Sequence, residues 1–540
     1  MITADQLKDV MDRADALHRY LNIDQKKVEF EEEQLRTQAP DFWEDPKYAQ
    51  EQMKKVKGIQ KWLDGYKTVR LYADELKLAF DFYKDEMVTE EEVDADYAKA
   101  IKAIEDLELK NMLRQKEDPM DCVLKINSGA GGTESQDWAQ MLMRMYMRWA
   151  LNAKRALVWQ AWCKANKAAA YHLPATDSLG STTDKWQLPD TLEPHAVMPF
   201  YYGSKGSKPE AGYPLYVYLH GSGPKQQEWQ TGLILAKRFA DAPSLYFIPQ
   251  IPNEGEWYRW WQRSKQVAWS NLLREAMLSP DVNPNRLYVF GISEGGYGSQ
   301  RLASFYADYW AAAGPMAGGE PLKNAPVENL ENIGFSFRTG ANDAGFYRNR
   351  LTGYTKEALD SMEALYPAGF RHKVELIPGR QHFIDYSVTT PWLSHFIRNP
   401  YPKHFIWEDF EMDGLHRTGF YNIKVNKRPA TECRTRYDVN IAANEVNIVV
   451  EDVHYTTVER DPVYGIELKF ARHYTPARGG SFTLYLDEHL VDLSQPVKVV
   501  VNGKTICERR LRLDVKNMVQ SLATYFDPER IYPAAVEVVY

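Results

Sequence analysis

The stretch Leu287-Tyr-Val-Phe-Gly-Ile-Ser293-Glu-Gly-Gly-Tyr-Gly298 decides how the middle of this 540-residue chain folds. A short apolar run leads into Gly-x-Ser-x-Gly, and a further glycine and a helical pattern follow it. This order predicts a strand, a sharp turn and a helix, with Ser293 at the turn. The small residues let strand and helix approach, and the helix N-terminus favours a developing negative charge. We predict that Ser293 is a nucleophile; the alternative is a glycine-rich structural turn.

A serine hydroxyl needs a base, and the base needs a third group to orient it. Downstream of Ser293, Asp343 follows the apolar run 335–339, and His382 follows the run 373–377. Both residues come just after a predicted strand, on the edge of the sheet where Ser293 is expected. We predict that Asp343 orients His382 and that His382 takes the serine proton. Asn342 beside Asp343 remains an alternative. Asp385 comes three residues after His382 and is expected to be a cap or a surface acid. The other weaker candidates lie on the wrong edge of the sheet or towards the domain boundary: His372, His395, His404 and His416.

An oxyanion formed at this serine needs two backbone N–H donors. Glu294 follows the nucleophile and supplies one donor by its position. The other is expected from His220-Gly-Ser-Gly223, which follows the predicted strand 215–219. Gly221 and Ser222 both remain candidates for it. His220 itself is expected to be a structural hydrogen-bonding residue.

An aromatic loop follows the predicted strand 245–249, on the same edge of the sheet. It contains Trp257, Trp260 and Trp261 together with Arg259. Exposed tryptophans are costly unless they bind something, so we predict a wall of the substrate site. The alternative is that two of the three pack under the loop as core.

Alternating short strands and helical patterns predict a parallel sheet with crossover helices. Residues 210–395, with the motifs quoted above, resemble the α/β-hydrolase superfamily, nearest to its esterase, polyhydroxybutyrate-depolymerase and prolyl-oligopeptidase-like members. The resemblance implies a serine hydrolase acting through an acyl-enzyme, on small-molecule or carbohydrate-linked esters, with a peptidase as the alternative. Neither a cofactor nor a metal is expected. We assign residues 151–209 to a connecting and N-terminal segment and 210–400 to the catalytic domain. After Pro400 and Pro402, alternating apolar residues predict an all-β appendage over 401–540.

The first part of the chain has a different character. Apolar residues at three- and four-residue steps predict helices over 7–21, 48–82 and 93–113, packed as a bundle or coiled coil within residues 1–115. A short strand is then expected over 122–126, before a glycine-rich turn and a helix over 135–150. The turn lacks the lysine and spacing of the known phosphate-binding loops.

Residues 1–149, and above all the segment from Ile126 to Ala150, resemble the N-terminal part of the bacterial peptide chain release factor 2 family. This implies a helical first domain, a truncated start of a second domain over 116–150, and a ribosome contact through residues 1–115. The sequence has no Gly-Gly-Gln tripeptide and no Ser-Pro-Phe tripeptide, so we expect no release activity. An alternative is a translation-related protein without hydrolysis. The resemblance ends inside a predicted helix, whereas natural fusions more often join at exposed linkers. A third hypothesis is therefore that the chain is a fusion, frameshift or assembly product. Sequencing the locus across codons 140–160 tests it.

Composition excludes several classes of protein. Lys+Arg 66 against Asp+Glu 74 gives a net charge of −8, which argues against DNA binding by the whole chain. The four cysteines are far apart and show no metal or redox spacing. The sequence has no apolar run that reaches a membrane span and no signal-peptide core, so we expect no membrane partner and a cytoplasmic protein. The hydrolase part is nevertheless compatible with a secreted or periplasmic origin.

Overall fold

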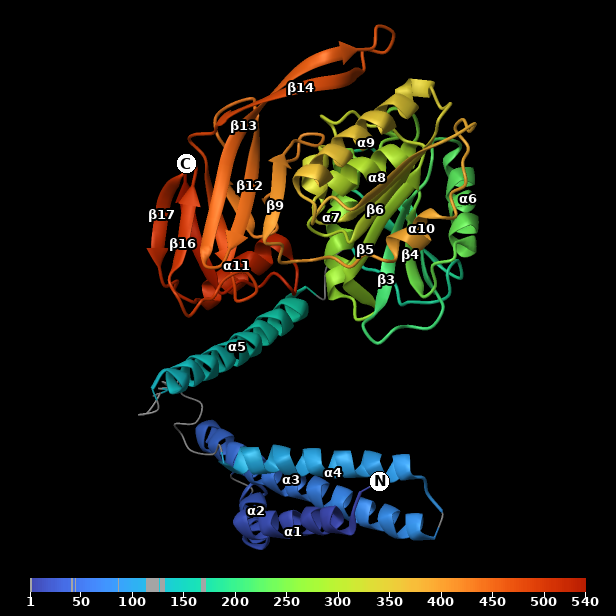
Figure 1. The fold of residues 1–540 in the computed structure, drawn as a ribbon. Coiled ribbons are helices and arrows are strands. Elements are labelled where there is room, and N and C mark those ends of the chain that lie inside the picture. Colours follow the sequence, from blue (N-terminus) through green and yellow to red (C-terminus); the bar gives the residue numbers. More distant parts are fainter. Residues whose placement is uncertain are drawn as a thin grey trace. The chain divides into compact units, whose positions relative to one another are not determined.

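The computed structural model describes residues 2–39, 42–43, 45–85, 87–112, 126, 132–166 and 171–540 (Figure 1). The chain divides into two compact units, residues 1–126 and 127–540. The boundary lies close to the expected end of the helical domain at residue 115.

The first unit is helical, as predicted. Val10, Ala14 and Leu17 lie on one buried stripe of the first helix, and Thr3 caps that helix with a reciprocal bond to Gln6. Pro46 occupies the first turn of the long third helix, where its missing N–H costs nothing. The helices are α1 (Ala4–Tyr20), α2 (Ile23–Arg36), α3 (Pro46–Lys84) and α4 (Glu90–Met112).

Helix α5 (Gly132–Ala165) opens the second unit. It runs without interruption past residue 150, where the segment 116–150 was expected to end, so that boundary falls inside one helix. The predicted strand 122–126 and the glycine-rich turn lie outside the described residues, apart from Ile126 and the helix start. No helix among the residues that the structure describes is long and apolar enough to cross a membrane.

A mixed eight-stranded sheet forms the centre of the second unit, in the order β1-β2-β4-β3-β5-β6-β7-β8. The first three strands in this order pair antiparallel and the rest pair parallel. Because β1 and β2 precede residue 210, the sheet begins earlier than the predicted catalytic segment 210–400. The strands are β1 (Thr183–Gln187), β2 (Val197–Lys205), β3 (Tyr213–Leu219), β4 (Ser244–Pro249), β5 (Val282–Ile292), β6 (Ala312–Met316), β7 (Gly334–Gly340) and β8 (His372–Ile377).

Alternation along the strands sends side chains to two separate cores. On β3, Leu215 and Val217 join the core that contains side chains of α7, α8 and α9, whereas Tyr216 and Tyr218 join the core that contains side chains of α6 and α10. Helices therefore cover both faces of the sheet (Figure 1). These helices are α6 (Lys225–Arg238), α7 (Arg263–Leu278), α8 (Glu294–Phe305), α9 (Arg348–Leu365) and α10 (Thr389–Leu393).

The C-terminal part is rich in β structure, but the expectation of an all-β appendage is wrong in one element. Helix α11 (Val515–Tyr525) buries Met518, Leu522 and Tyr525, so its apolar stripe is part of the core. The two sheets have the orders β10-β11-β15-β18 and β17-β16-β13-β12-β9, with β14 paired to β13. The strands are β9 (His404–Asp409), β10 (Gly419–Phe420), β11 (Ile423–Lys427), β12 (Arg434–Ala442), β13 (Glu445–Arg460), β14 (Glu467–Pro476), β15 (Ser481–Leu486), β16 (Val497–Val501), β17 (Lys504–Arg509) and β18 (Ala534–Val539).

Buried ion pairs join the C-terminal part to the α/β part. Arg530 bonds Asp308 at 2.6 Å and Asp527 at 2.7 Å, and all three side chains are inaccessible to solvent. Arg398 bonds Asp527 at 2.6 Å, and Arg417 bonds Asp308 at 3.0 Å. A buried carboxylate is tolerated only when cations and hydrogen bonds compensate it. The two parts are therefore held together by charge as well as by a shared apolar core.

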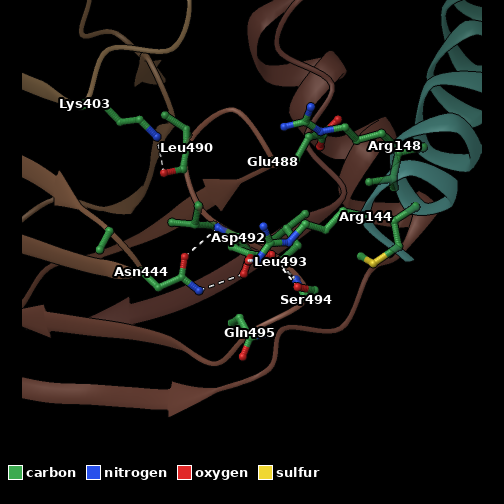
Figure 2. Close-up of a pocket in the computed structure, with 14 residues that line it drawn as sticks. Arg144, Arg148, Lys403, Asn444, Glu488, Leu490, Asp492, Leu493, Ser494 and Gln495 are labelled. Atoms are coloured by element: carbon green, nitrogen blue, oxygen red, sulfur yellow. Dashed lines mark hydrogen bonds and ion pairs between the residues drawn. The ribbon is translucent and has the colours of Figure 1, made fainter. Parts of the chain in front are cut away.

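Helix α5 packs on the C-terminal part through polar contacts. Arg155 donates to Glu488 at 2.8 Å and to the carbonyl of Ile531 at 2.9 Å. About three turns closer to the start of α5, on the same side of the helix, Arg144 pairs with Asp492 at 2.8 Å beside a cavity of about 460 Å³ (Figure 2). Arg144 and Arg148 line this cavity from the helix, and Lys403 from the other side.

Candidate active site

Ser293 stands at the turn between β5 and α8, as predicted. Its backbone has φ 57° and ψ −115°, a conformation that an L-residue adopts only under constraint. The close approach of helix and strand explains why Gly295 is a glycine. A Cβ there would lie 1.9 Å from the carbonyl oxygen of Leu219. The turn therefore presents the Ser293 hydroxyl at the carboxyl ends of the parallel strands.

The structure brings Ser293, His382 and Asp343 into one line of hydrogen bonds. His382 Nε2 lies 2.9 Å from Ser293 Oγ, and His382 Nδ1 lies 2.7 Å from Asp343 Oδ2. Asp343 follows β7 and His382 follows β8, so adjacent parallel strands deliver both residues to the same edge. The carboxyl of Asp343, rather than the neighbouring Asn342, contacts the imidazole. This arrangement permits proton transfer from serine to histidine.

Arg348, at the start of α9, is a member of the site that the sequence did not suggest. Its Nε and Nη2 atoms donate to the two carboxylate oxygens of Asp343, at 2.9 and 2.7 Å. Burial raises the pKa of Asp343, but the bonds from Arg348 and His382 outweigh it, so the pKa lies below the usual 3.8. Asp343 therefore stays ionised in the folded protein.

The weaker candidates have other partners. His372 contacts Asp360 at 3.0 Å, and His416 contacts Asp409 at 3.2 Å. His404 lies between Glu331 and Asp438, at 2.6 and 3.1 Å. Asp385 accepts hydrogen bonds from the backbone N–H and the hydroxyl of Ser387, and the His395 ring bonds the carbonyl of Trp392.

The loop after β3 lies next to the nucleophile. A Cβ on Gly221 would be 3.4 Å from the Cβ of Ser293, and Ser222 lines the cavity at the serine. His220 is fully buried, and its Nε2 accepts the N–H of Ile251 at 3.1 Å, which makes the ring neutral with its proton on Nδ1. Burial lowers the pKa of His220 to about 4. His220 therefore serves as a hydrogen-bonding support for this loop.

The three tryptophans that were predicted to line the substrate site have different environments in the structure. Trp260 is 0% exposed and donates to the carbonyl of His220 at 3.0 Å, so its expected place in the substrate wall is wrong. Trp257 is half-buried over the Lys265 ammonium, away from the cavity. Trp261 does line the cavity, with the Arg301 guanidinium 4.0 Å above its ring. The aromatic loop mainly anchors the backbone that flanks the serine, because Tyr258 also donates to the Gly221 carbonyl at 2.7 Å.

A cavity of about 600 Å³ opens at Ser293. The side chain of Glu294 reaches into it, 3.3 Å from Arg259 and only 11% exposed. Burial raises the pKa of Glu294 to about 7, and Arg259 opposes that rise. One further side of the cavity comes from β13 and β14, a contribution that the sequence did not indicate. The lining residues from that hairpin are Arg460, Gly465, Ile466, Glu467 and Phe470.

Among the described residues, one group of side chains could gather round a metal ion: Asp487, Glu488 and His489. Two of its carboxylates already pair with Arg155, at 3.4 Å for Asp487 and 2.8 Å for Glu488. The group therefore works as the anchor of α5.

Known proteins match the two parts of the chain separately, and the match to the first part extends past the boundary at residue 126 into α5. Residues 26–160 match the PCRF domain model. Peptide chain release factor 2 of Aeromonas hydrophila is 34% identical over 148 residues, which cover 27% of this chain and 40% of that protein. The same factor of Tolumonas auensis is also 34% identical over 148 residues. The chain thus spans 40% of the length of these release factors. The match reaches residue 160, beyond the end near 149 that the sequence suggested.

Solved structures similar to the mixed α/β part include esterases. A thermostable esterase is 19% identical with a TM-score of 0.32, over 40% of this chain and 63% of that one. A CE1 ferulic acid esterase from Anaeromyces mucronatus is 12% identical with a TM-score of 0.29, over 42% of this chain and 93% of that one.

Proposed function

We propose that residues 127–540 form a serine hydrolase of the α/β-hydrolase type, which cleaves carboxylic esters through an acyl-enzyme. The observation that carries this proposal is the line from Asp343 through His382 to Ser293, with contacts of 2.7 and 2.9 Å. The strained backbone of Ser293 adds support, because such a conformation persists only where the surrounding structure enforces it.

The reaction follows from the positions of these groups. His382 Nε2 takes the proton of Ser293 as the serine oxygen attacks the ester carbonyl carbon, and Asp343 stabilises the resulting imidazolium. The backbone N–H groups of Glu294 and of Ser222, or of Gly221 beside it, stabilise the oxyanion. The carbon–oxygen bond of the ester then breaks, and His382 returns its proton to the departing alcohol. Water repeats the sequence on the acyl-serine and releases the acid.

Fluorophosphonate labelling of the intact chain tests the nucleophile. The probe phosphonylates an activated serine, so the wild type should label rapidly and Ser293→Ala should not. Ser361→Ala, which removes an exposed hydroxyl from α9, is the matched control and should label as the wild type does. Unchanged labelling of Ser293→Ala would show that the nucleophile is assigned wrongly. Parallel assays with p-nitrophenyl esters and peptide p-nitroanilides separate an esterase from the alternative, a serine peptidase.

The helical N-terminal unit supports a second proposal, that it contacts the ribosome. The supporting observation is the PCRF match over residues 26–160, together with 34% identity to release factor 2. Co-sedimentation of the full chain with ribosomes tests it, with a chain lacking residues 1–126 as control. Equal pelleting of the two proteins would remove this proposal. Binding without any hydrolysis by the full chain would instead favour a purely translation-related protein.

A further inference from the structure

The hairpin formed by β13 and β14 extends beyond the sheet to which it belongs (Figure 1). Strand β13 pairs with β12 only as far as Val453, and with β16 only over residues 445–448. From His454 to Arg460, β13 pairs with β14 alone. A two-stranded ribbon is only marginally stable by itself, so its position depends on what its end contacts.

The end of the ribbon is attached to the α/β part close to the triad. Asp461 accepts a hydrogen bond from the Tyr347 hydroxyl at 2.5 Å, and Glu459 pairs with Arg350 at 2.8 Å. Tyr347 immediately precedes Arg348, the residue that holds Asp343. Phe346 and Tyr347 both have left-handed backbones, with φ of 50° and 60°. This strained segment connects the ribbon to the catalytic line, which favours a functional role for the contact.

The ribbon supplies apolar surface to the cavity at Ser293. Ile466 and Phe470 are half-buried and line the cavity, together with Trp261 and Phe346 from the α/β part. Aromatic and aliphatic walls are suited to the flat face of a ring. The cavity of about 600 Å³ has room for a ring-bearing substrate as well as the reacting ester.

Three polar atoms of residues that line this cavity are buried without a hydrogen bond of good geometry within the described part of the chain: Glu294 Oε1, the hydroxyl of Tyr297 and Arg301 Nε. Arg301 Nε is paired with Glu320 at 2.8 Å, and the oxygen of the Tyr297 hydroxyl lies beside the Arg348 guanidinium. Glu294 Oε1 and the proton of the Tyr297 hydroxyl are therefore the groups left to pair with a substrate.

Because the pKa of Glu294 is about 7, both the ionised carboxylate, which only accepts, and the protonated carboxyl, which also donates, are present at neutral pH. A hydroxyl both donates and accepts, so it can pair with either form. Because Arg259 already lies 3.3 Å from Glu294, little net negative charge is left to attract an ammonium group.

An anionic substrate group is also disfavoured, because the arginines that line the cavity already have carboxylate partners. Arg301 pairs with Glu320 at 2.8 Å, and Arg460 pairs with Glu467 at 2.9 Å. Arg348 pairs with Asp343 at 2.7 Å. A neutral donor such as a hydroxyl therefore fits the open positions best.

We infer that the ribbon of β13 and β14 is the substrate-selecting wall of the site, and that the cavity takes an ester bearing a hydroxylated ring. Phe470 and Ile466 contact the face of the ring, and Glu294 and Tyr297 bond its hydroxyls. The inference rests on the hydrolase activity proposed above. A sugar ester and a phenolic ester share this chemistry, so both are included in the test.

The test measures kcat/KM on matched pairs of esters. Cyclohexyl acetate is compared with a monoacetylated methyl glucoside, and methyl 3-phenylpropanoate with methyl 3-(4-hydroxyphenyl)propanoate; p-nitrophenyl acetate is the small reference. Phe470→Ala should lower the ratio of ring-ester to reference kcat/KM about tenfold, and Ile466→Ala about threefold, mainly through KM. Val458→Ala, an exposed position on the same ribbon, is the control and should leave the ratio unchanged.

Tyr297→Phe should lower the preference for the hydroxylated member of a pair about tenfold, which is about 1.4 kcal/mol. A preference seen only with the glucoside identifies a sugar, and one seen only with the phenol identifies a phenolic ring. A wild type that prefers the hydroxylated ester in neither pair overturns the hydroxylated-ring assignment. Unchanged ratios in both Phe470→Ala and Ile466→Ala, in folded proteins that still label at Ser293, overturn the ribbon's role but leave the hydrolase proposal standing. Failure of the wild type to label overturns the hydrolase proposal instead.

Discussion

Arg348 holds both carboxylate oxygens of Asp343, at 2.9 and 2.7 Å, while the same carboxyl accepts His382 Nδ1 at 2.7 Å. The aspartate is thus fixed from two sides, and its orientation does not depend on the histidine alone. Arg348 acts through Asp343, so we regard it as a positioning residue.

Arg348→Met should lower kcat about 100-fold, because a misplaced catalytic group costs roughly that much. Arg348→Lys keeps the positive charge but loses the bidentate hydrogen bonds to Asp343, so it should keep only part of the wild-type rate. Without the guanidinium the pKa of Asp343 rises, and the acid limb of the pH–rate profile should move to higher pH in Arg348→Met. A purely structural arginine would lower the melting temperature without moving that limb.

Gly295→Ala should abolish labelling of Ser293. The added Cβ would lie 1.9 Å from the Leu219 carbonyl oxygen, so the helix must move away from the strand and carry the serine turn with it. Gly353→Ala in α9 is the matched control, since nothing lies within 4 Å of its Cβ. That control should raise the free energy of unfolding by about 0.5–1 kcal/mol. Full labelling of Gly295→Ala would contradict the described turn.

His404 should stabilise the fold most strongly in mildly acidic solution. Burial lowers its pKa, but Asp438 and Glu331 outweigh burial and raise it to about 9, against 6.5 in the unfolded chain. The stabilisation is therefore complete below pH 6.5 and is lost as the pH rises through 9. His404→Gln should cost on the order of 2 kcal/mol more at pH 6 than at pH 9.5 by urea unfolding. His395→Gln, which removes an exposed ring bonded to the carbonyl of Trp392, is the control.

Glu294 should have the opposite effect on stability. Its pKa rises from 4.5 to about 7 through burial, so the folded protein binds the proton more tightly than the unfolded chain does. This carboxyl therefore lowers stability as the pH rises from 4.5 to 7. Glu294→Gln should raise the free energy of unfolding by on the order of 2 kcal/mol more at pH 8 than at pH 4. Equal effects at the two pH values would mean that the carboxyl is hydrated; Glu256→Gln is the exposed control.

Much of the α/β sheet could be predicted because its signals are local. The apolar runs that became β3, β4 and β7 are short and buried along their whole length. Asp343 and His382 could be placed because strand ends in a parallel sheet meet at one edge. The antiparallel strands β1 and β2 gave no comparable signal, since β1 is mostly exposed.

The features that the sequence did not indicate depend on contacts between segments that are distant in the chain. Arg460 and Phe470 line the cavity at Ser293, which lies more than 150 residues earlier in the chain. The periodicity of a sequence does not indicate contacts between such distant residues. Trp260 was misread because composition cannot tell a tryptophan that supports a loop from one that faces substrate. Helix α11 was missed for a related reason: its apolar stripe is short and lies between strands.

The ion pair that attaches the ribbon of β13 and β14 to the α/β part is more exposed to water than the ion pair that holds Asp343 in the triad. The pair between Arg350 and Glu459 is 43% and 36% exposed, whereas Arg348 and Asp343 are 12% and 3% exposed. Dissolved salt weakens exposed ion pairs much more than buried ones, because the screening length falls from about 8 Å at 0.15 M to about 3 Å at 1 M. Ionic strength should therefore change which esters the protein prefers before it changes the catalytic step. In brine the proposed hydrolase would therefore be less selective.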